Sequence, residues 1–475
     1  MTILMGKSPF TNWAQEHYPN KILVFSAIEG IREKCSLRIP DETLQLISER
    51  LEFYSPALQR HVPTRNLNRI NELLVEAIAS ALIHLDLNEV TYAIFETSAA
   101  HHIDNIVLEI VCDLQDIEKI FLSHTSFTLG LLPIAQKVSV DTRKPIMTGI
   151  FEENCQTIDL NLAGENWQRR ISMSKSDEVS LFKFLLKLFF ARLFRNFVKI
   201  KCVFSRDKHC RSQSVDEYVE RFYGYNFFDD VKVALSQRIA LWYFKILSRS
   251  KLMRKRAEEV EEANLPRIIL HAHYQPEVSS FPLGYPYHDQ LFLVQTLMQI
   301  FPKSKIVYRE HPHISRLMVH GAPTRVGISR CPKYYWQLYK WGCIFPAKQN
   351  DFLRSESDSD VNVTLTGKIA IERALSGKQS LIFGNPWYKG CPNVVHYQDS
   401  NYIGSLFSQA DCSQAAETWI KELLCYNLVA TPPWSHITSL EKSNEFLVYN
   451  QDLIKLIDFL ESDYALSDVY IKNQL

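Results

Sequence analysis

The sequence lacks any Cys-x-x-Cys pair, although ten cysteines are scattered along its 475 residues. This absence argues against a zinc ribbon and a redox-active dithiol, and it fits reduced thiols in a cytoplasm. The sequence also lacks a surplus of either charge, because 53 Lys and Arg residues balance 53 Asp and Glu residues. A protein without a basic surplus is not expected to have nucleic acid as its main partner.

Long apolar runs are missing too. The first residues, MTILMGKSPFTNWAQ, contain no apolar core long enough for a signal peptide. No run of about 18 uncharged apolar residues is present, so no transmembrane helix is expected. We therefore expect a cytoplasmic protein, and we leave open whether it binds peripherally to the inner face of the cytoplasmic membrane.

Predicted strands and helices alternate in both halves of the chain. Apolar residues make up 46% of the sequence, which allows large cores, and a chain of this length usually forms two or three domains. In the first half, the patterns predict strands at 21–27, 90–97 and 117–124 and helices at 71–85 and 103–114. From Pro266 the alternation resumes, and it closes with helices at 413–425 and 440–462. This βαβ order predicts parallel sheets with helices on their faces.

The region between these halves, about 176–257, is basic and helical in pattern. The stretch LFKFLLKLFFARLFRNFVKIKCVF has no acidic residue, and a second basic cluster, RSKLMRKR at 249–256, runs into AEEVEEAN. The second pattern predicts an exposed helix that ends before Pro266. The stretch 182–211 fits either a buried helix whose Lys and Arg side chains extend to solvent or a membrane-surface helix, and both remain open. We expect two α/β domains joined near 235–265.

Polar side chains follow the first predicted strand of the second half. His271, His273, Gln275 and Glu277 lie on one side if the chain stays extended, and Pro276 favours that extension. Open parallel sheets bind ligands beyond the carboxyl ends of their strands. The alternative is a surface loop with incidental polar residues.

Two further predicted strands end in the same way. The strand in KIVYREHP ends at Glu310 and His311, and Pro312 stops it. The strand in VNVTLTGK leads into a Thr/Gly turn that opens a helix, where free backbone N–H groups and a positive dipole end suit a phosphate. The alternative is a plain N-cap with a solvated Glu372. The candidate residues of this turn and helix are Thr364, Thr366, Gly367, Lys368 and Glu372.

Together, the segments HAHYQPEVSSFPLGYPYHDQ, VYREHP and VTLTGKIAIERALSGKQSLIFGNPWY resemble the bacterial capsule-polysaccharide biosynthesis glycosyltransferases. That family includes the β-Kdo transferases of capsule and O-antigen synthesis. The match covers about 266–392, roughly a quarter of the chain. Two positions depart from it: Lys368 replaces a small hydroxyl residue and Gln379 replaces a Pro. Lys368 either reinforces phosphate binding or signals a changed donor.

The resemblance implies an α/β fold of the GT-B type, with two Rossmann-like domains facing across a cleft. Residues 1–235 would form an N-terminal acceptor domain that carries the basic helical insertion, and residues 266–475 would form the nucleotide-sugar-binding domain with its closing helices. It also implies transfer without a metal ion or a cofactor other than the nucleotide-sugar donor, which would be CMP-linked. The sequence offers no Asp-x-Asp at a convincing strand end, since DSD at 358–360 lies in the polar run RSESDSD.

The resemblance and the strand-end positions together assign roles. The predicted donor-binding residues are His273, Gln275, Glu310, His311, Thr364, Thr366, Gly367, Lys368 and Glu372. For catalysis we predict a carboxylate, with Glu277 first and Asp104 second, and an acceptor-side acid or base at His102. The other interpretation of Asp104 is an acidic residue that stabilises a helix N-terminus.

The function implied is a glycosyltransferase of surface polysaccharide synthesis, capsule or O-antigen. It would transfer an acidic sugar such as Kdo from a CMP-sugar to a glycan or glycolipid acceptor. Two alternatives remain: a CDP-polyol phosphate transferase of the teichoic-acid type, and a non-catalytic subunit of a polysaccharide assembly complex. The predicted partners are the nucleotide-sugar and the glycan or lipid-linked acceptor, with an anionic membrane surface left open.

Overall fold

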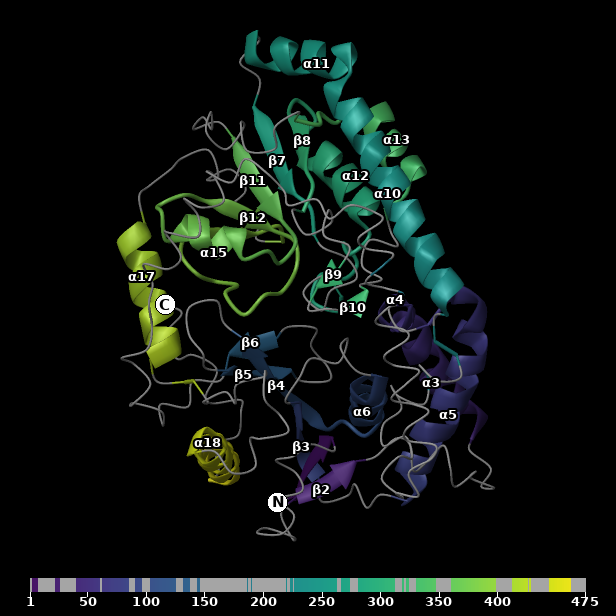
Figure 1. The fold of residues 1–475 in the computed structure, drawn as a ribbon. Coiled ribbons are helices and arrows are strands. Elements are labelled where there is room, and N and C mark those ends of the chain that lie inside the picture. Colours follow the sequence, from purple (N-terminus) through teal and green to yellow (C-terminus); the bar gives the residue numbers. More distant parts are fainter. Residues whose placement is uncertain are drawn as a thin grey trace.

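A computed structural model of the chain describes residues 2–6, 22–25, 40–59, 62–84, 90–95, 103–124, 131–136, 143–145, 186, 189, 219, 223–224, 226–262, 266–273, 281–311, 318–319, 322–323, 330–346, 360–398, 412–425, 427–428 and 444–462. Two sheets organise these residues, and helices lie beside both (Figure 1). The chain is a mixed α/β protein, as the alternating patterns predict.

The first sheet has six strands in the order β2-β1-β3-β4-β5-β6. The strands are β1 Thr2–Gly6, β2 Ile22–Phe25, β3 Val90–Phe95, β4 Glu118–His124, β5 Leu131–Gln136 and β6 Arg143–Pro145. The pairs from β2 through β4 are parallel, as predicted, although β1, which lies between β2 and β3, was not predicted as a strand. The β4–β5 and β5–β6 pairs are antiparallel, which the sequence analysis missed. The connection 125–130 is too short for the dozen or so residues that a parallel crossover needs.

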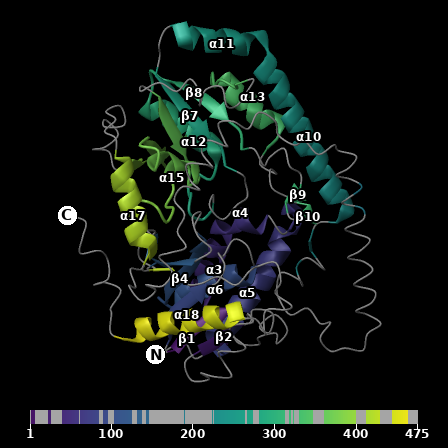
Figure 2. The same ribbon diagram turned by 60° about the vertical axis from the view of Figure 1, so that its left-hand side comes forward.

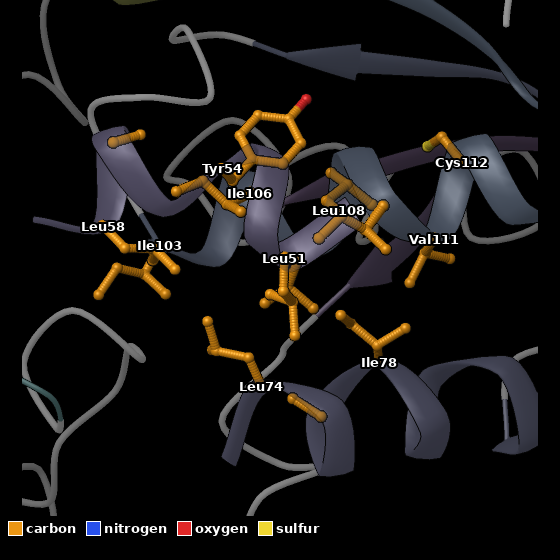
Figure 3. Packing of buried hydrophobic residues seen from close by; sticks show 14 of the residues in the cluster. Leu51, Tyr54, Leu58, Leu74, Ile78, Ile103, Ile106, Leu108, Val111 and Cys112 are labelled. Atoms are coloured by element: carbon orange, nitrogen blue, oxygen red, sulfur yellow. The ribbon is translucent and has the colours of Figure 1, made fainter. Parts of the chain in front are cut away.

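The helices of the first half pack around one apolar cluster. They are α3 Asp41–Phe53, α4 Ser55–Leu58, the 3₁₀ turn η1 Thr64–Asn66, α5 Leu67–His84 and α6 Ile103–Leu114. Figure 3 shows Leu51 pointing toward Leu74 and Ile78 of α5, with Leu58 beside Ile103 of α6. Each such fully buried side chain stabilises the fold by about 1.5–3 kcal/mol. The predicted helices 71–85 and 103–114 are confirmed as α5 and α6.

The second sheet is fully parallel, in the order β13-β12-β11-β7-β8. Its strands are β7 Arg267–His271, β8 Lys305–Arg309, β11 Val361–Thr364, β12 Ser380–Ile382 and β13 Val394–His396, and its helices are α12 Gln290–Ile300, α13 Pro332–Lys340 and α15 Ile369–Ala374. A short antiparallel pair, β9 Met318–Val319 and β10 Ala322–Pro323, follows β8. The chain moves from β7 to β8 on one side, then returns to β11 on the other side. The carboxyl ends of β7 and β11 therefore form a topological switch point.

Helices α10 Phe227–Arg249 and α11 Lys251–Glu262 precede the second sheet. Ala240, Phe244 and Leu247 of α10 belong to the core cluster of that sheet, and α10 begins with a capping box between Asn226 and Asp229. The exposed helix predicted before Pro266 is confirmed as α11. The domain boundaries at 235 and 266 remain predictions, although the packing of α10 groups it with the second sheet.

Aromatic contacts connect the two halves. The ring of Phe53, at the end of α3, lies 5.0 Å from that of Phe281 and 4.9 Å from that of Tyr285, measured between centroids. The closing helices are α17 Ser413–Cys425 and α18 Asn444–Glu461, close to the predicted bounds. Residues of α17 share a core cluster with β5 and α15, and α18 lies near the first sheet in both views (Figures 1 and 2).

Among the helices that the structure describes, none has a stretch both long and apolar enough to cross a membrane. The basic stretch 182–211 lies outside the described residues, apart from Leu186 and Phe189.

Candidate functional site

The site is built where β7 and β11 end. His273 follows β7, and its Nε2 atom accepts a hydrogen bond from the backbone N–H of Thr366 at 3.1 Å. The same Nε2 lies 3.4 Å from Oγ1 of Thr364, the last residue of β11. The Thr364 hydroxyl in turn accepts from the N–H of Gly367 at 3.2 Å. One imidazole thus joins two of the sequence segments at the switch point of the sheet.

His273 is neutral at physiological pH. Burial, followed by the positive charge of Arg330, lowers the pKa of His273 from 6.5 to about 4. Because Nε2 accepts a backbone hydrogen bond, the proton of the neutral ring lies on Nδ1. At neutral pH the ring therefore holds the 364–367 turn in place and carries no charge to a ligand.

Two glycines allow the close packing of this turn. A Cβ atom on Gly367 would lie 2.5 Å from Thr364 Oγ1, and one on Gly384 would lie 2.4 Å from Cγ2 of Thr366 and 2.7 Å from the carbonyl oxygen of Leu283. The Tyr388 hydroxyl donates to the Gly367 carbonyl at 2.6 Å. Neighbouring segments on several sides therefore fix the turn, with no room for a methyl group at either glycine.

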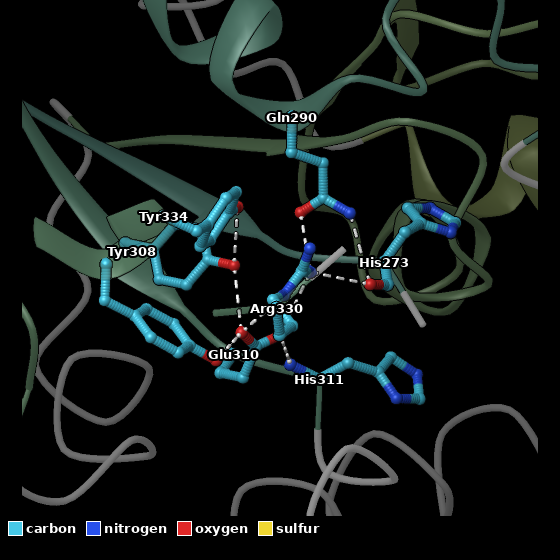
Figure 4. Close-up of polar contacts among 8 residues, drawn as sticks. His273, Gln290, Tyr308, Glu310, His311, Arg330 and Tyr334 are labelled. Atoms are coloured by element: carbon cyan, nitrogen blue, oxygen red, sulfur yellow. Dashed lines mark hydrogen bonds and ion pairs between the residues drawn. The ribbon is translucent and has the colours of Figure 1, made fainter. Parts of the chain in front are cut away.

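A second, fully buried network surrounds the end of β8 (Figure 4). Oε2 of Glu310 accepts from Tyr308 at 3.0 Å, from Tyr335 at 2.7 Å and from Nε of Arg330 at 2.9 Å. Oε1 accepts from the backbone N–H of His311 at 2.9 Å. Both carboxylate oxygens are therefore engaged inside the protein.

Arg330 connects this network to the switch point. Its Nη2 donates to the carbonyl oxygen of His273 at 3.0 Å and to Gln290 Oε1 at 3.1 Å. Gln290 donates to the same carbonyl at 3.2 Å, and the guanidinium lies 4.7 Å above the ring of Tyr334. Burial alone would lower the pKa of Arg330, but the Glu310 carboxylate raises it well above its ordinary value. Arg330 therefore stays charged, and its hydrogen bond to the His273 carbonyl fixes the backbone at the end of β7.

A third group of polar contacts lies between the central strands. His271 Nδ1 accepts from Arg309 at 3.2 Å, which leaves its Nε2 as the donor to Asn362 Oδ1 at 2.8 Å. Arg267 and Asp360 form a buried ion pair at the opposite end of the same strands. His271 thus links β8, β7 and β11 below the switch point.

The structure brings His273, Thr364, Thr366 and Gly367 into direct contact. The sequence predicted free backbone N–H groups for a phosphate at this turn, and that expectation is wrong for two residues. The N–H groups of Thr366 and Gly367 donate to His273 and Thr364 and do not face an open site. Lys368, by contrast, is exposed at the start of α15.

Three other predicted site residues, Glu372, His311 and Asp104, do not take part in this contact. Glu372 is buried on α15, and the pKa of Tyr388 is raised by burial first and by the nearby Glu372 second. His311 is half-buried, and its imidazole points away from the Glu310–Arg330 pair (Figure 4). Asp104 lies in the first turn of α6, a helix of the first sheet. The binding roles of all these residues remain predictions.

Three predicted residues, Gln275, Glu277 and His102, lie outside the described residues. Within the described part of the chain, no group of three His, Cys, Asp or Glu side chains is placed to hold a metal ion. Arg330 was not predicted from the sequence, because it stands in GISRCPK without any motif around it. Arg330 is identified only by the fold, which brings it to His273, 57 positions earlier in the chain.

No protein-family model matches the sequence, and no curated protein matches it. Among solved structures, the chain is similar to Thermosulfurimonas dismutans KpsC, beta Kdo 2,7 transferase, at 12% identity with a TM-score of 0.30, over 96% of this chain and 99% of that one. It is also similar to Thermosulfurimonas dismutans KpsC, beta Kdo 2,4 transferase, at 12% identity with a TM-score of 0.20, over 40% of this chain and 62% of that one.

A third similar structure is Methanocaldococcus jannaschii UDP-GlcNAc 2-epimerase in complex with UDP-GlcNAc and UDP. The identity is 10% and the TM-score 0.21, over 88% of this chain and 98% of that one. TM-scores this low do not show an activity. The function is therefore inferred from the residues of the site.

Proposed function

We propose that this chain is a nucleotide-sugar-dependent glycosyltransferase of surface polysaccharide synthesis, capsule or O-antigen. It transfers an acidic sugar such as Kdo from a CMP-linked donor to a glycan or lipid-linked acceptor. The observation that carries the proposal is the contact of His273 with the 364–367 turn at the switch point of the second sheet. Open α/β sheets bind ligands there, and both contacting segments belong to the motifs that resemble capsule-polysaccharide glycosyltransferases.

On the donor side, Lys368 is the residue that we assign to the phosphate. Its ammonium group is exposed next to the fixed turn, and a cation there stabilises the negative charge that builds on a leaving phosphate. His311 and Glu372 would contact the CMP portion, at its base or ribose. We assign Glu310 a positioning role, because its carboxylate is already engaged by Arg330, Tyr308 and Tyr335.

For the transfer step, we propose that Glu277 is the first candidate for the catalytic carboxylate. In the step, the acceptor hydroxyl forms a bond to the anomeric carbon while the bond to the CMP oxygen breaks, and a carboxylate takes the hydroxyl proton. Asp104 and His102, from the first α/β unit, are the acceptor-side candidates. This assignment includes a GT-B arrangement, with the two sheets facing across the site.

A panel of donors tests this function. The purified chain is incubated separately with CMP-Kdo, CMP-sialic acid, CDP-glycerol and UDP-sugars, and the released nucleotide is measured. Release of CMP from CMP-Kdo above the rate without protein supports the proposal. Release of CMP from CDP-glycerol alone would assign the chain to the polyol phosphate transferases, and no release together with no binding of any of these nucleotides would indicate a non-catalytic subunit.

A further inference from the structure

Helix α10 has apolar side chains on two opposite faces. One face, with Ala240, Phe244 and Leu247, is buried in the core of the second sheet. The other face consists of Leu235, Ile239, Trp242 and Ile246, which we call the α10 surface. These four side chains are 47%, 46%, 64% and 44% exposed. A helix with apolar residues on both faces normally has a partner on each of them.

The α10 surface is continuous and lies on the outside of the fold. At 1.5 Å per residue, the four side chains extend over about 16 Å of the helix. In both views α10 runs along one edge of the described helices and strands, with α11 continuing from its end (Figures 1 and 2). The four side chains therefore form one exposed stripe along α10.

Beyond its first turn, the charged residues of α10 itself have a single sign. Between Val231 and Ala257 the sequence contains eight Lys or Arg residues and no Asp or Glu. Lys232 and Arg249 are exposed on α10. On α11 the exposed Lys251 and Arg254 are followed by exposed Glu258 and Glu259, and Lys255 pairs with Glu259 at 3.8 Å. An exposed Trp, Leu and Ile stripe bordered by cations is typical of helices that lie in the interface of an anionic membrane.

We propose that the α10 surface docks this protein on an anionic lipid bilayer. Trp242, Leu235, Ile239 and Ile246 enter the boundary between headgroups and acyl chains, while the bordering Lys and Arg side chains contact the lipid phosphates. This inference is independent of the proposed enzymatic function, because it rests only on α10 and α11.

The competing occupant is a second copy of this chain. The spacing of the four residues, at 235, 239, 242 and 246, also fits the seam of a coiled coil. However, two α10 surfaces that face one another would bring the Lys and Arg residues of α10 together, because α10 has no acidic residue after position 230 to pair with them. Like charges at an interface oppose association, so the charge pattern favours the anionic surface.

The test is sedimentation of the full chain with vesicles of phosphatidylglycerol and phosphatidylcholine in equal parts, and with vesicles of phosphatidylcholine alone. We expect binding to the anionic vesicles at low salt and release at high salt. Replacing Leu235, Ile239, Trp242 and Ile246 by Gln should lower the partition coefficient at least about tenfold. Gln is a good helix former and these side chains are exposed, so the fold should remain.

The matched control replaces Leu46 and Met298 by Gln, because these side chains are 51% and 40% exposed on other helices. This control should bind anionic vesicles like the wild type. A milder variant, Leu235→Gln with Trp242→Gln, gives the same comparison if the fourfold variant does not fold.

Three results would overturn the proposal. They are no binding of the wild type to anionic vesicles, equal binding to neutral vesicles, and equal binding of the α10 variants and the wild type. Analytical ultracentrifugation adds the test of the competing occupant. A wild-type dimer that the α10 substitutions convert to a monomer would assign this surface to a second copy instead.

Discussion

Replacing Arg330 by Met would break the buried ion pair next to the candidate site. The Arg330 side chain is 0% exposed and that of Glu310 is 2% exposed. Removing one partner of a buried pair costs about 3–5 kcal/mol, because the other charge is left buried and uncompensated. Glu310 would keep hydrogen bonds from Tyr308, Tyr335 and the His311 backbone. We therefore expect the lower end of that range, about 3 kcal/mol.

The assay is hydrogen exchange of the β7 and β8 amides, which reports the free energy of local opening. The Arg330→Met variant is compared with Glu310→Gln and with the double variant. Glu310→Gln removes the carboxylate charge that Arg330→Met leaves uncompensated. The free energy of opening should therefore fall less in the double variant than the sum of the falls in the two single variants, by roughly 1–3 kcal/mol.

The matched control is Lys421→Met, which breaks the Lys421–Glu417 pair. Those side chains are 53% and 48% exposed, so the expected loss is below about 1 kcal/mol. If Arg330→Met lowers the free energy of opening no more than this control does, Arg330 is not the residue that fixes the end of β7.

Three further predictions follow from the site. The pKa of His273 is about 4 in the fold and 6.5 when unfolded, so the unfolded chain binds more protons between these values. Stability should fall by about 3 kcal/mol as the pH drops from 6.5 to 4, and a denaturation series in His273→Gln should lose this dependence. Gly384→Ala should destabilise the turn at Thr366 by about 1–3 kcal/mol in thermal melts, and an unchanged melting temperature would show that the turn can shift to accept the added methyl group. Glu277→Gln should lower turnover far more than donor affinity, and near-normal turnover would place the catalytic carboxylate elsewhere.

Local patterns predicted most helices and parallel strands, because apolar periodicity is a property of neighbouring residues. The predicted helix 103–114 has the bounds of α6. Strand β5 was missed because its sequence, LLPIAQ, contains a proline, which argues against a strand that is paired on both sides. In the structure Pro133 pairs with Leu122 of β4, whereas β6 pairs only with residues 134–136. The missing N–H therefore costs no ladder hydrogen bond on that side.

The contact between the first and third motif segments could also be anticipated, since the carboxyl ends of parallel strands share one edge. The hydrogen bond from the Thr366 N–H to His273 could not be anticipated, because the imidazole comes from the end of another strand. The role of Arg330 could not be anticipated either, because its partners come from three separate segments. They are Glu310, Gln290 and His273. Such long-range polar networks leave no periodic signal in the sequence.

The most direct test of the central claim is calorimetric titration of CMP into the wild type and three single variants. We expect His311→Ala and Lys368→Ala each to weaken CMP binding about tenfold, a loss of about 1.4 kcal/mol, without a change in melting temperature. Lys303→Ala is the control, because Lys303 is exposed at the amino end of β8, the opposite edge of the sheet, and it should bind CMP like the wild type. Unaltered affinity in both site variants, or an equal loss in the control, would contradict a CMP site at this switch point.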